Sequence, residues 1–307
     1  MTDSLVVAGE ALIDVVAAPD GTLVGHPGGG PYTVARSIGR LEQPVAYLGR
    51  ISTDGFGARL RHELEDDGVG LDAIVATDAP TTLALVELDA SGTAAYRFYV
   101  GGTSAPGLTL EAATAVLPER IETLCVGALG LVFEPMATTL ERLVERVAPG
   151  TLVALDPNCR PAAIEDRAAY RARLERVLRR TDALKVSEDD LGWLLPGSSA
   201  TDAARALLPG GESVALVTLG SRGALIVRGD DDVVAVEAPP VEVVDTIGAG
   251  DAFTGAFLAH WRSRGLGRAE LGGREELIEA TRFACRVAAL TCARAGAEPP
   301  RRAELDG

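Results

Sequence analysis

Short apolar runs alternate with longer segments of helical character along this chain, and the alternation limits it to few folds. Residues 5–8 and 45–48 are apolar runs that each end at a glycine. Between them, Pro31 begins a segment that we expect to be helical as far as Leu41, because proline is tolerated in the first turn of a helix. Strands that alternate with helices are typical of an α/β protein.

The same rhythm continues to the C-terminus. Strands are predicted at 123–126, 152–155, 183–186 and 214–218, and helices at 56–66, 135–147, 167–179 and from near Gly250 and Arg274. No internal repeat, low-complexity tract or linker interrupts the pattern. We therefore expect residues 1–307 to form one domain.

Two segments near the N-terminus have the alternation and turn residues of β-hairpins. Asp20-Gly21 lies inside the first, which spans 15–27, and residues 89–92 form the turn of the second, which spans 82–100. Together they predict a small sheet beside the main domain. Such a sheet either acts as a lid over a site at the strand ends or packs on the body as a simple meander.

The last of these predicted strands has two different faces. Successive side chains of a strand point to opposite sides, so Tyr96, Phe98 and Val100 share one face. Arg97 and Tyr99 share the other. The alternation therefore separates these aromatic residues into two groups.

The net charge of −15 comes from 29 basic and 44 acidic residues. This balance argues against nucleic acid or an anionic membrane surface as a partner, since both need clustered cations. Hydrophobic residues make up 47% of the chain and aromatic residues only 4%, so the core must consist mainly of Val, Leu, Ala and Ile. The sequence contains no run of about 18 apolar residues, the length that would predict a membrane span.

The four cysteines, at 125, 159, 285 and 292, show no C-x-x-C spacing and do not cluster with the three histidines. Cys125 and Cys285 lie among apolar neighbours and are predicted to be core residues. Residues 1–7 lack the features of a signal peptide. These observations predict a reduced, cytoplasmic protein.

The strongest functional signal lies between residues 241 and 258. An apolar, β-prone run at 241–244 predicts a strand, the glycine-rich residues 245–251 follow it, and 252–258 form a nearly all-apolar helix. A helix that begins at such a turn directs unpaired N–H groups and the positive end of its dipole at one point. Phosphate is the natural ligand there, and small residues at 248–250 allow it to approach the backbone.

Asp251 has two interpretations. It either stabilises the start of the helix, where acidic residues are favoured, or acts as a base that accepts a proton from an attacking hydroxyl. The second role belongs to phosphoryl transfer, where an oriented acceptor and anion stabilisation work together. The sequence contains no P-loop motif, and no G-x-G-x-x-G follows the first strand, which disfavours a dinucleotide-binding dehydrogenase.

The segment Asp245-Thr-Ile-Gly-Ala-Gly-Asp251 resembles the D-T-x-G-A-G-D signature of the ribokinase-like (PfkB) carbohydrate kinases. Five further segments resemble that family in the expected order, beginning at Gly9, Gly28, Asp156, Lys185 and Val217. The matches span nearly the whole chain. The resemblance implies a ribokinase-like three-layer α/β/α domain with a mainly parallel central sheet and a small β-sheet lid. It also implies ATP-dependent phosphorylation of a hydroxyl of a small sugar.

The resemblance assigns roles to individual positions. Asp251 would be the catalytic base, and the amides of Gly248, Ala249 and Gly250 the anion hole. The implied substrate-binding residues are Asp14, Gly28, Gly29, Thr33, Arg97, Tyr99 and Arg160. The implied nucleotide-binding residues are Lys185, Ser187, Thr218, Gly220, Ser221 and Gly223. Read without the resemblance, these are strand-end turn residues, flexible loops and solvated charges.

Metal ions are implied by the same resemblance. The carbonyl oxygens of Asp245, Ile247, Thr291 and Gly296 match a monovalent-cation loop suited to K⁺. Mg²⁺ accompanies ATP, held mainly by phosphates and water. The N-x-x-E magnesium motif of the family appears here with Ser187 first and Asp190 last. Thr33 replaces the asparagine that the sugar loop of the family usually carries, which leaves the substrate open.

Several functions fit these residues. Residues 96–103 resemble the lid strand of fructokinase-like members, so a ketohexose such as fructose is the first candidate substrate. A sugar acid such as 2-keto-3-deoxygluconate is next, because Arg97 or Arg160 offers a guanidinium to its carboxylate. Ribose and nucleosides are less favoured. A catalytically silent sensor of sugar or nucleotide is the alternative of another class. Exposed edge strands of the small sheet can pair with a second copy of the chain, which would give a homodimer. A monomer is the alternative.

Overall fold

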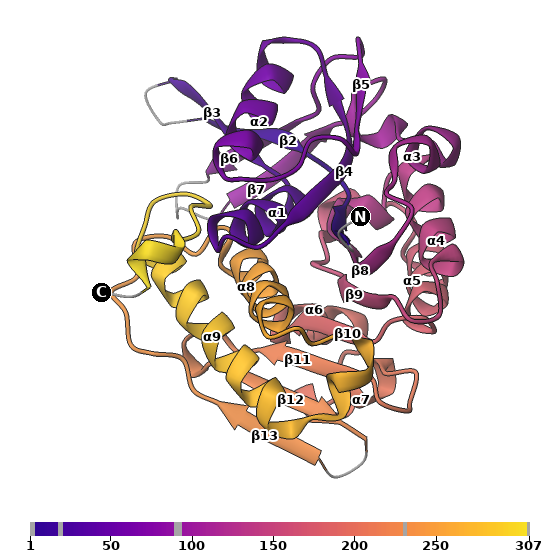
Figure 1. The fold of residues 1–307 in the computed structure, drawn as a ribbon. Coiled ribbons are helices and arrows are strands. Elements are labelled where there is room, and N and C mark those ends of the chain that lie inside the picture. The colour runs from indigo at the N-terminus through magenta and orange to yellow at the C-terminus, as the bar shows by residue number, and fades with distance from the viewer. Residues whose placement is uncertain (1–3, 18–20, 89–93, 230–231, 306–307) are drawn as a thin grey trace.

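The computed structural model describes residues 4–17, 21–88, 94–229 and 232–305 (Figure 1). Its main sheet has nine strands, in the order β13-β12-β11-β10-β9-β8-β1-β4-β5. From β11 to β5 all neighbours are parallel, whereas β11, β12 and β13 pair antiparallel. The strand bounds, in sheet order, are Asp232–Val236, Ala224–Arg228, Val214–Thr218, Ala183–Ser187, Leu152–Asp156, Ile121–Gly127, Ser4–Ala8, Val45–Ser52 and Ile74–Thr77.

Helices cover both faces of this sheet, as the alternation in β1 requires. Leu5 and Val7 pack into one apolar layer, and Val6 and Ala8 into the other. The first layer is closed by α1 (Gly30–Arg40), α2 (Gly55–Asp66), α8 (Ala249–Ser263) and α9 (Arg274–Cys292). The second is closed by α3 (Leu110–Val116), α4 (Met136–Arg146), α5 (Arg167–Leu178), α6 (Glu188–Leu194) and α7 (Ala200–Leu207). The predicted three-layer fold is confirmed.

A separate four-stranded sheet lies beside the main one, in the order β3-β2-β6-β7. Its strands are β2 (Leu12–Ala17), β3 (Leu23–Gly28), β6 (Leu83–Leu88) and β7 (Ala94–Tyr99). Parallel pairing of β2 with β6 joins the two hairpins. The predicted small sheet is confirmed, although Asp20 and the turn at 89–92 lie outside the described residues.

Two local predictions were wrong. Residues 241–244 form no strand. Pro239 and Pro240 precede them and cannot donate ladder hydrogen bonds, and Val243 and Val244 are 58% and 62% exposed. Strand β4 does not end at Gly49 but continues to Ser52. The hydroxyl of Tyr47 would lie 2.5 Å from a Cβ at position 49, so glycine is needed within that strand for close packing.

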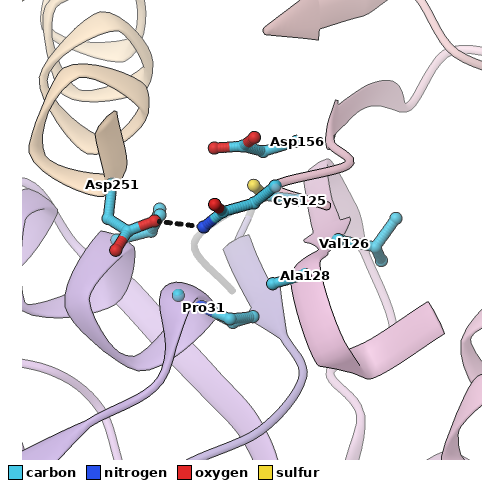
Figure 2. Close-up of a pocket in the computed structure, with 10 residues that line it drawn as sticks. Pro31, Cys125, Val126, Ala128, Asp156 and Asp251 are labelled. Carbon is cyan, nitrogen blue, oxygen red and sulfur yellow. Dashed lines mark hydrogen bonds between the residues drawn. The ribbon is translucent and has the colours of Figure 1, made fainter. Parts of the chain in front are cut away.

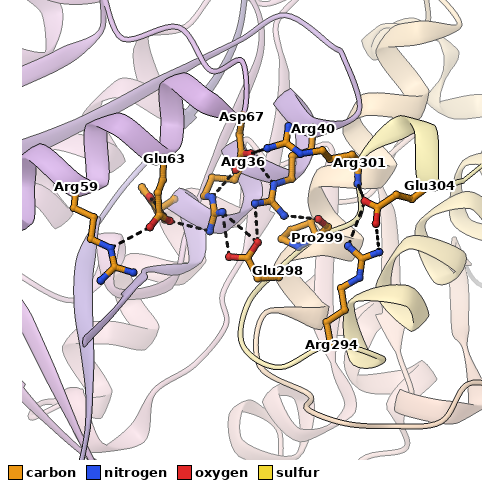
Figure 3. A network of polar contacts seen from close by, with 11 residues as sticks. Arg36, Arg40, Arg59, Glu63, Asp67, Arg294, Glu298, Pro299, Arg301 and Glu304 are labelled. Atoms are coloured by element: carbon orange, nitrogen blue, oxygen red, sulfur yellow. Dashed lines mark hydrogen bonds and ion pairs between the residues drawn. The ribbon is translucent and has the colours of Figure 1, made fainter. Parts of the chain in front are cut away.

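Ion pairs fasten the C-terminal segment to α1 (Figure 3). Asp67 is 2% exposed at its side chain and pairs with Arg36 at 2.7 Å and with Arg40 and Arg301 at 2.8 Å. Glu298 pairs with Arg36 and Arg40 in turn. This network holds residues 298–301 against the helix that begins beside the glycine loop at 28–30.

Cys125 and Cys285 are buried, as predicted. Among the described helices, none is long and apolar enough to cross a membrane.

Candidate active site

A cleft of about 1100 Å³ opens between the main sheet and the small sheet. Its floor is formed by residues at or just beyond the carboxyl ends of parallel strands: Glu10 after β1, Asn158 after β9, Ser187 in β10 and Thr218 in β11. Asp14 of β2 faces it from the small sheet. Ligands of open α/β sheets bind at this edge.

The start of helix α8 forms one wall of the cleft. Gly248 precedes the helix with a φ of 75°, in the left-handed region that favours glycine. Gly248, Ala249 and Gly250 all line the cleft, as predicted for an anion hole. The Ala249 N–H donates to the carbonyl oxygen of Thr246 at 3.3 Å, so that amide already has a local partner. The first-turn amides beyond it are the better donors to an anion.

Lys185 lies directly beneath this turn. Its Nζ is 3.0 Å from Oδ2 of Asp156, and the hydroxyl of Thr254 donates to the same oxygen at 3.1 Å. A Cβ on residue 250 would come 2.8 Å from Nζ, so glycine at 250 makes room for the ammonium. Burial acts to lower the pKa of Lys185, but the carboxylates of Asp156, Asp190 and Asp251 outweigh it and raise that pKa. The lysine therefore places a positive charge under the turn at 248–250.

Asp251 sits in the first turn of α8 and is half-buried. Its Oδ1 accepts a hydrogen bond from Nδ2 of Asn158 at 3.1 Å, drawn as the dashed line in Figure 2. Burial and the charge of Asp156 raise the pKa of Asp251 to about 7, against the opposing effects of Lys185 and Arg160. A carboxyl group with such a pKa is suited to general base catalysis near neutral pH.

Asp14, Gly28, Gly29 and Thr33, which were predicted to bind substrate, all line the cleft. A Cβ on residue 28 would lie 2.1 Å from Oδ2 of Asp14, so the carboxylate occupies the space that a larger residue would need. Burial raises the pKa of Asp14 to about 6, and the charge of Arg160 opposes the shift. Arg160 also lines the cleft, as predicted.

The residues of β7 that line the cleft differ from those predicted. Tyr96 and Phe98 line the cleft, whereas Arg97 and Tyr99 do not. The side chains alternate along β7, and Phe98 is held by Phe133 with ring centroids 6.2 Å apart, which fixes the inward face. Tyr96 stacks on Phe98 at 6.1 Å. The aromatic pair, and not Arg97 with Tyr99, faces the cleft.

The predicted nucleotide-binding residues all line the cleft: Lys185, Ser187, Thr218, Gly220, Ser221 and Gly223. Gly223 has a φ of 90°, and a Cβ there would meet the carbonyl oxygen of Val236 at 2.1 Å. Opposite them is an apolar wall that the sequence did not reveal, because it joins a loop to one face of α9. Its members include Pro239, Val241, Val243, Ala289 and Cys292.

Asp190, the predicted magnesium ligand, has hydrogen-bond partners on both carboxyl oxygens. Its Oδ2 accepts from the hydroxyl of Ser187 at 2.6 Å within the capping box of α6, and its Oδ1 accepts from the Cys159 N–H at 2.7 Å. Both oxygens are therefore already hydrogen-bonded. The described residues contain no group of three or more His, Cys, Asp and Glu side chains that would hold a metal. Glu188 and Asp189 provide the acidic groups at this end of the cleft.

The two loops of the predicted cation site lie together. Oδ2 of Asp245 accepts from the N–H of Gly296 at 2.9 Å, and its Oδ1 accepts from the N–H of Ile247 at 3.0 Å. The N–H groups of Val244 and Asp245 both donate to the carbonyl oxygen of Cys292. Residues 245–247 and 292–296 are thus joined, and Thr291 is buried at the end of α9.

Glu10 is a buried site residue that sequence reasoning did not assign. Its Oε1 accepts from the N–H of Gly30 at 3.2 Å, which ties the end of β1 to the glycine loop. Burial raises its pKa to about 8, so it carries a proton at neutral pH. A carboxylate two residues beyond the end of a buried strand was the available signal.

Comparison with known proteins decides the family. The model of the pfkB family carbohydrate kinases matches residues 2–303. The chain belongs to the pfkB family of carbohydrate kinases. This pfkB kinase is 37% identical over 261 residues to a fructokinase of Rhizobium leguminosarum bv. trifolii, covering 82% of this chain and 77% of the relative.

Two solved structures are also similar to this kinase. Fructokinase of Xylella fastidiosa with bound ATP has a TM-score of 0.88 at 27% identity, covering 97% of this chain and 94% of that one. A double mutant of Vibrio cholerae fructokinase, bound to fructose, ADP and potassium, has a TM-score of 0.83 at 25% identity, covering 96% and 94%. The predicted class, an ATP-dependent carbohydrate kinase, is confirmed.

Proposed function

We propose that this pfkB kinase phosphorylates a hydroxyl of a ketohexose, with fructose as the leading substrate. One observation carries the proposal: Asp251 stands in a single cleft with the glycine turn at 248–250 on one side and Asp14 on the other. The relatives named fructokinase support the choice of sugar.

The step follows from these positions. Asp14 and the backbone at Gly28 and Gly29 hold the sugar, with the acceptor hydroxyl beside Asp251. The carboxylate of Asp251 takes the hydroxyl proton as the oxygen bonds to the γ-phosphorus, and the bond from that phosphorus to the β–γ bridging oxygen breaks to release ADP. The first-turn amides of α8 and the ammonium of Lys185 stabilise the charge on the transferring group.

The residues of the chain support a Mg²⁺ site and a K⁺ site to different degrees. Mg²⁺ would be held chiefly by the phosphates and water, with Glu188 and Asp189 as the nearby carboxylates, since Asp190 is used in the α6 cap. K⁺ fits the joined loops that contain Asp245 and Gly296, whose carbonyl oxygens are the ligands it prefers.

A second substrate class is favoured by Arg160. Its guanidinium lines the cleft close enough to Asp14 to affect the pKa of that residue. A sugar acid such as 2-keto-3-deoxygluconate would place its carboxylate there. Arg97 does not support this alternative, because it lies outside the cleft lining.

The test is a screen for ADP release with Mg-ATP over fructose, 2-keto-3-deoxygluconate, ribose and nucleosides. We expect fructose to give the highest kcat/KM, and Asp251→Asn to lower kcat by about 10²- to 10⁴-fold. Asp72→Asn, an exposed control, should retain the wild-type rate. Thermal stabilisation by ATP and sugar without ADP release would identify a silent sensor and overturn the proposal.

We also propose that residues 1–307 form one domain. We further propose that the small sheet can pair two copies of the chain as a homodimer. Leu23 is 64% exposed and Val24 44% exposed on β3, an edge strand of that sheet. Sedimentation of wild type and of Leu23→Glu tests the pairing, and a monomer at every concentration of wild type would refute it.

A further inference from the structure

Asn158 connects the proposed base to an arginine. It follows β9 with a φ of 38°, a left-handed backbone that few residues other than glycine adopt. Its Nδ2 donates to Oδ1 of Asp251 at 3.1 Å. Arg160 donates through one nitrogen to Oδ1 of Asn158 at 2.6 Å and to the Asn158 and Cys159 carbonyl oxygens at 3.2 Å each.

The chemistry of these groups determines which atom faces which. A guanidinium only donates hydrogen bonds, so the amide oxygen of Asn158 must face Arg160. The amide nitrogen therefore faces Asp251, and because it also only donates, Oδ1 of Asp251 must accept. Gly30 leaves room for this contact, since a Cβ there would come 3.2 Å from Nδ2 of Asn158 and 3.3 Å from Oδ1 of Asp251.

We propose that Arg160 and Asn158 form a positioning relay that gives the two oxygens of Asp251 different roles. Oδ1 is occupied by the amide donor, and Oδ2 is the oxygen that takes the proton of the acceptor hydroxyl. Asn158 and Arg160 are positioning residues in this relay. The inference rests on the proposed function for the role of Asp251 as the base.

The relay has a measurable electrostatic consequence. A donor to a carboxylate favours its charged form, so removal of the amide raises the pKa of Asp251. Several other charged or titratable groups face Asp251 from the surrounding elements. They are Glu10, Asp14, Cys125, Asp156, Arg160 and Lys185.

The decisive variant is Asn158→Gly, because glycine accepts the left-handed backbone without strain. We expect the acidic limb of the pH profile of kcat/KM to move up by roughly 0.5 to 1 pH unit. The loss of activity should then be larger at pH 6 than at pH 8.5. Asn158→Asp, which places a second carboxylate beside Asp251, should move the limb further in the same direction.

Arg160→Met tests the other half of the relay. The charge of Arg160 also lowers the pKa of Asp251 directly, so Arg160→Met should move the limb up in any case. The relay is tested by the coupling: the double variant with Asn158→Gly should move the limb by less than the sum of the two single shifts, and a shift equal to that sum would mean that the two residues act independently. Arg205→Met, outside the cleft, is the matched control and should leave the profile unchanged. An equal loss at every pH in Asn158→Gly would mean a merely structural role and would overturn the relay.

A second readout separates this inference from the proposed function. Titration of the Asp251 carboxyl carbon by NMR in the protein without substrate reports its pKa directly. A higher pKa in Asn158→Gly supports the relay even if no sugar in the panel is phosphorylated, and an unchanged pKa refutes it even if fructose is.

Discussion

The Nζ atom of Lys185 lies 3.0 Å from Oδ2 of Asp156, and Lys185 is the only lysine in the chain. Arginine supplies every other basic side chain that is not histidine. The single ammonium is 6% exposed and lies under Gly250, where a Cβ would come 2.8 Å away. An ammonium is compact, whereas a guanidinium is planar and larger, so this position has space for one and not for the other.

Replacement of Lys185 should therefore lower activity even when the positive charge is retained. We expect Lys185→Arg to lower kcat by at least about 10²-fold, because a displaced turn no longer presents its amides to the γ-phosphoryl group. Lys185→Met should also cost about 3–5 kcal/mol of unfolding free energy in urea, since it leaves Asp156 buried without its partner. Arg205→Lys is the surface control, with a change within about 0.5 kcal/mol. Wild-type turnover in Lys185→Arg would show that position 185 requires only charge.

Alanine substitution at two glycines with left-handed backbones distinguishes an effect of backbone strain on stability from an effect on activity. Gly248 has a φ of 75°, and a Cβ there would lie 2.6 Å from the Cβ of Ala297, whereas Gly265 has a φ of 67° with nothing within 4 Å. Alanine at either position should cost about 1 kcal/mol or more of stability. We expect only Gly248→Ala to lower kcat/KM for ATP, by about 10²-fold, because it displaces the turn that we propose binds the phosphates. Equal kinetic effects of the two variants would contradict this role.

The two tyrosines of β7 test the face of the lid. Tyr96 lines the cleft and Tyr99, at 51% exposure, does not. Tyr96→Ala should raise KM for the sugar by about 10-fold through loss of apolar contact, with little change in KM for ATP. Tyr99→Ala should leave both constants unchanged. The reverse result would mean that β7 presents its other face to the substrate.

Glu10 predicts a pH dependence of stability. Its pKa is raised from 4.5 to about 8 by burial, so the folded protein binds the proton more tightly than the unfolded chain. The stability that this proton provides is fully present below pH 4.5 and is lost as pH rises through 8. Glu10→Gln, which stays neutral, should match wild type near pH 5 and exceed it at pH 8.5 in urea unfolding. The exposed Glu165→Gln should show no such difference, and a parallel response of both variants would refute the assignment.

Much of the fold was predictable because it depends on local patterns. Apolar runs at 5–8, 152–155 and 214–217 are strands, since side chains buried on both faces leave a continuous apolar signal. Strands β12 and β13 were missed because they carry no helical crossover to mark them. The strand expected at 241–244 was wrong because the two prolines before it deny that segment a place in the sheet.

The sequence by itself determined that a glycine turn at 248–250 begins a buried helix. It also predicted an anion site there, because the unpaired backbone N–H groups at a helix start attract phosphate in any fold. It also identified Asp251, Asp14 and Lys185 as chemical candidates. Only the tertiary structure decided which groups meet: Asn158 on Oδ1 of Asp251, Lys185 under Gly250, Glu10 on Gly30, and Tyr96 in place of Tyr99 toward the cleft. The physical reason is that contacts between residues far apart in the chain depend on packing, and packing sets the distances and the burial that shift a pKa.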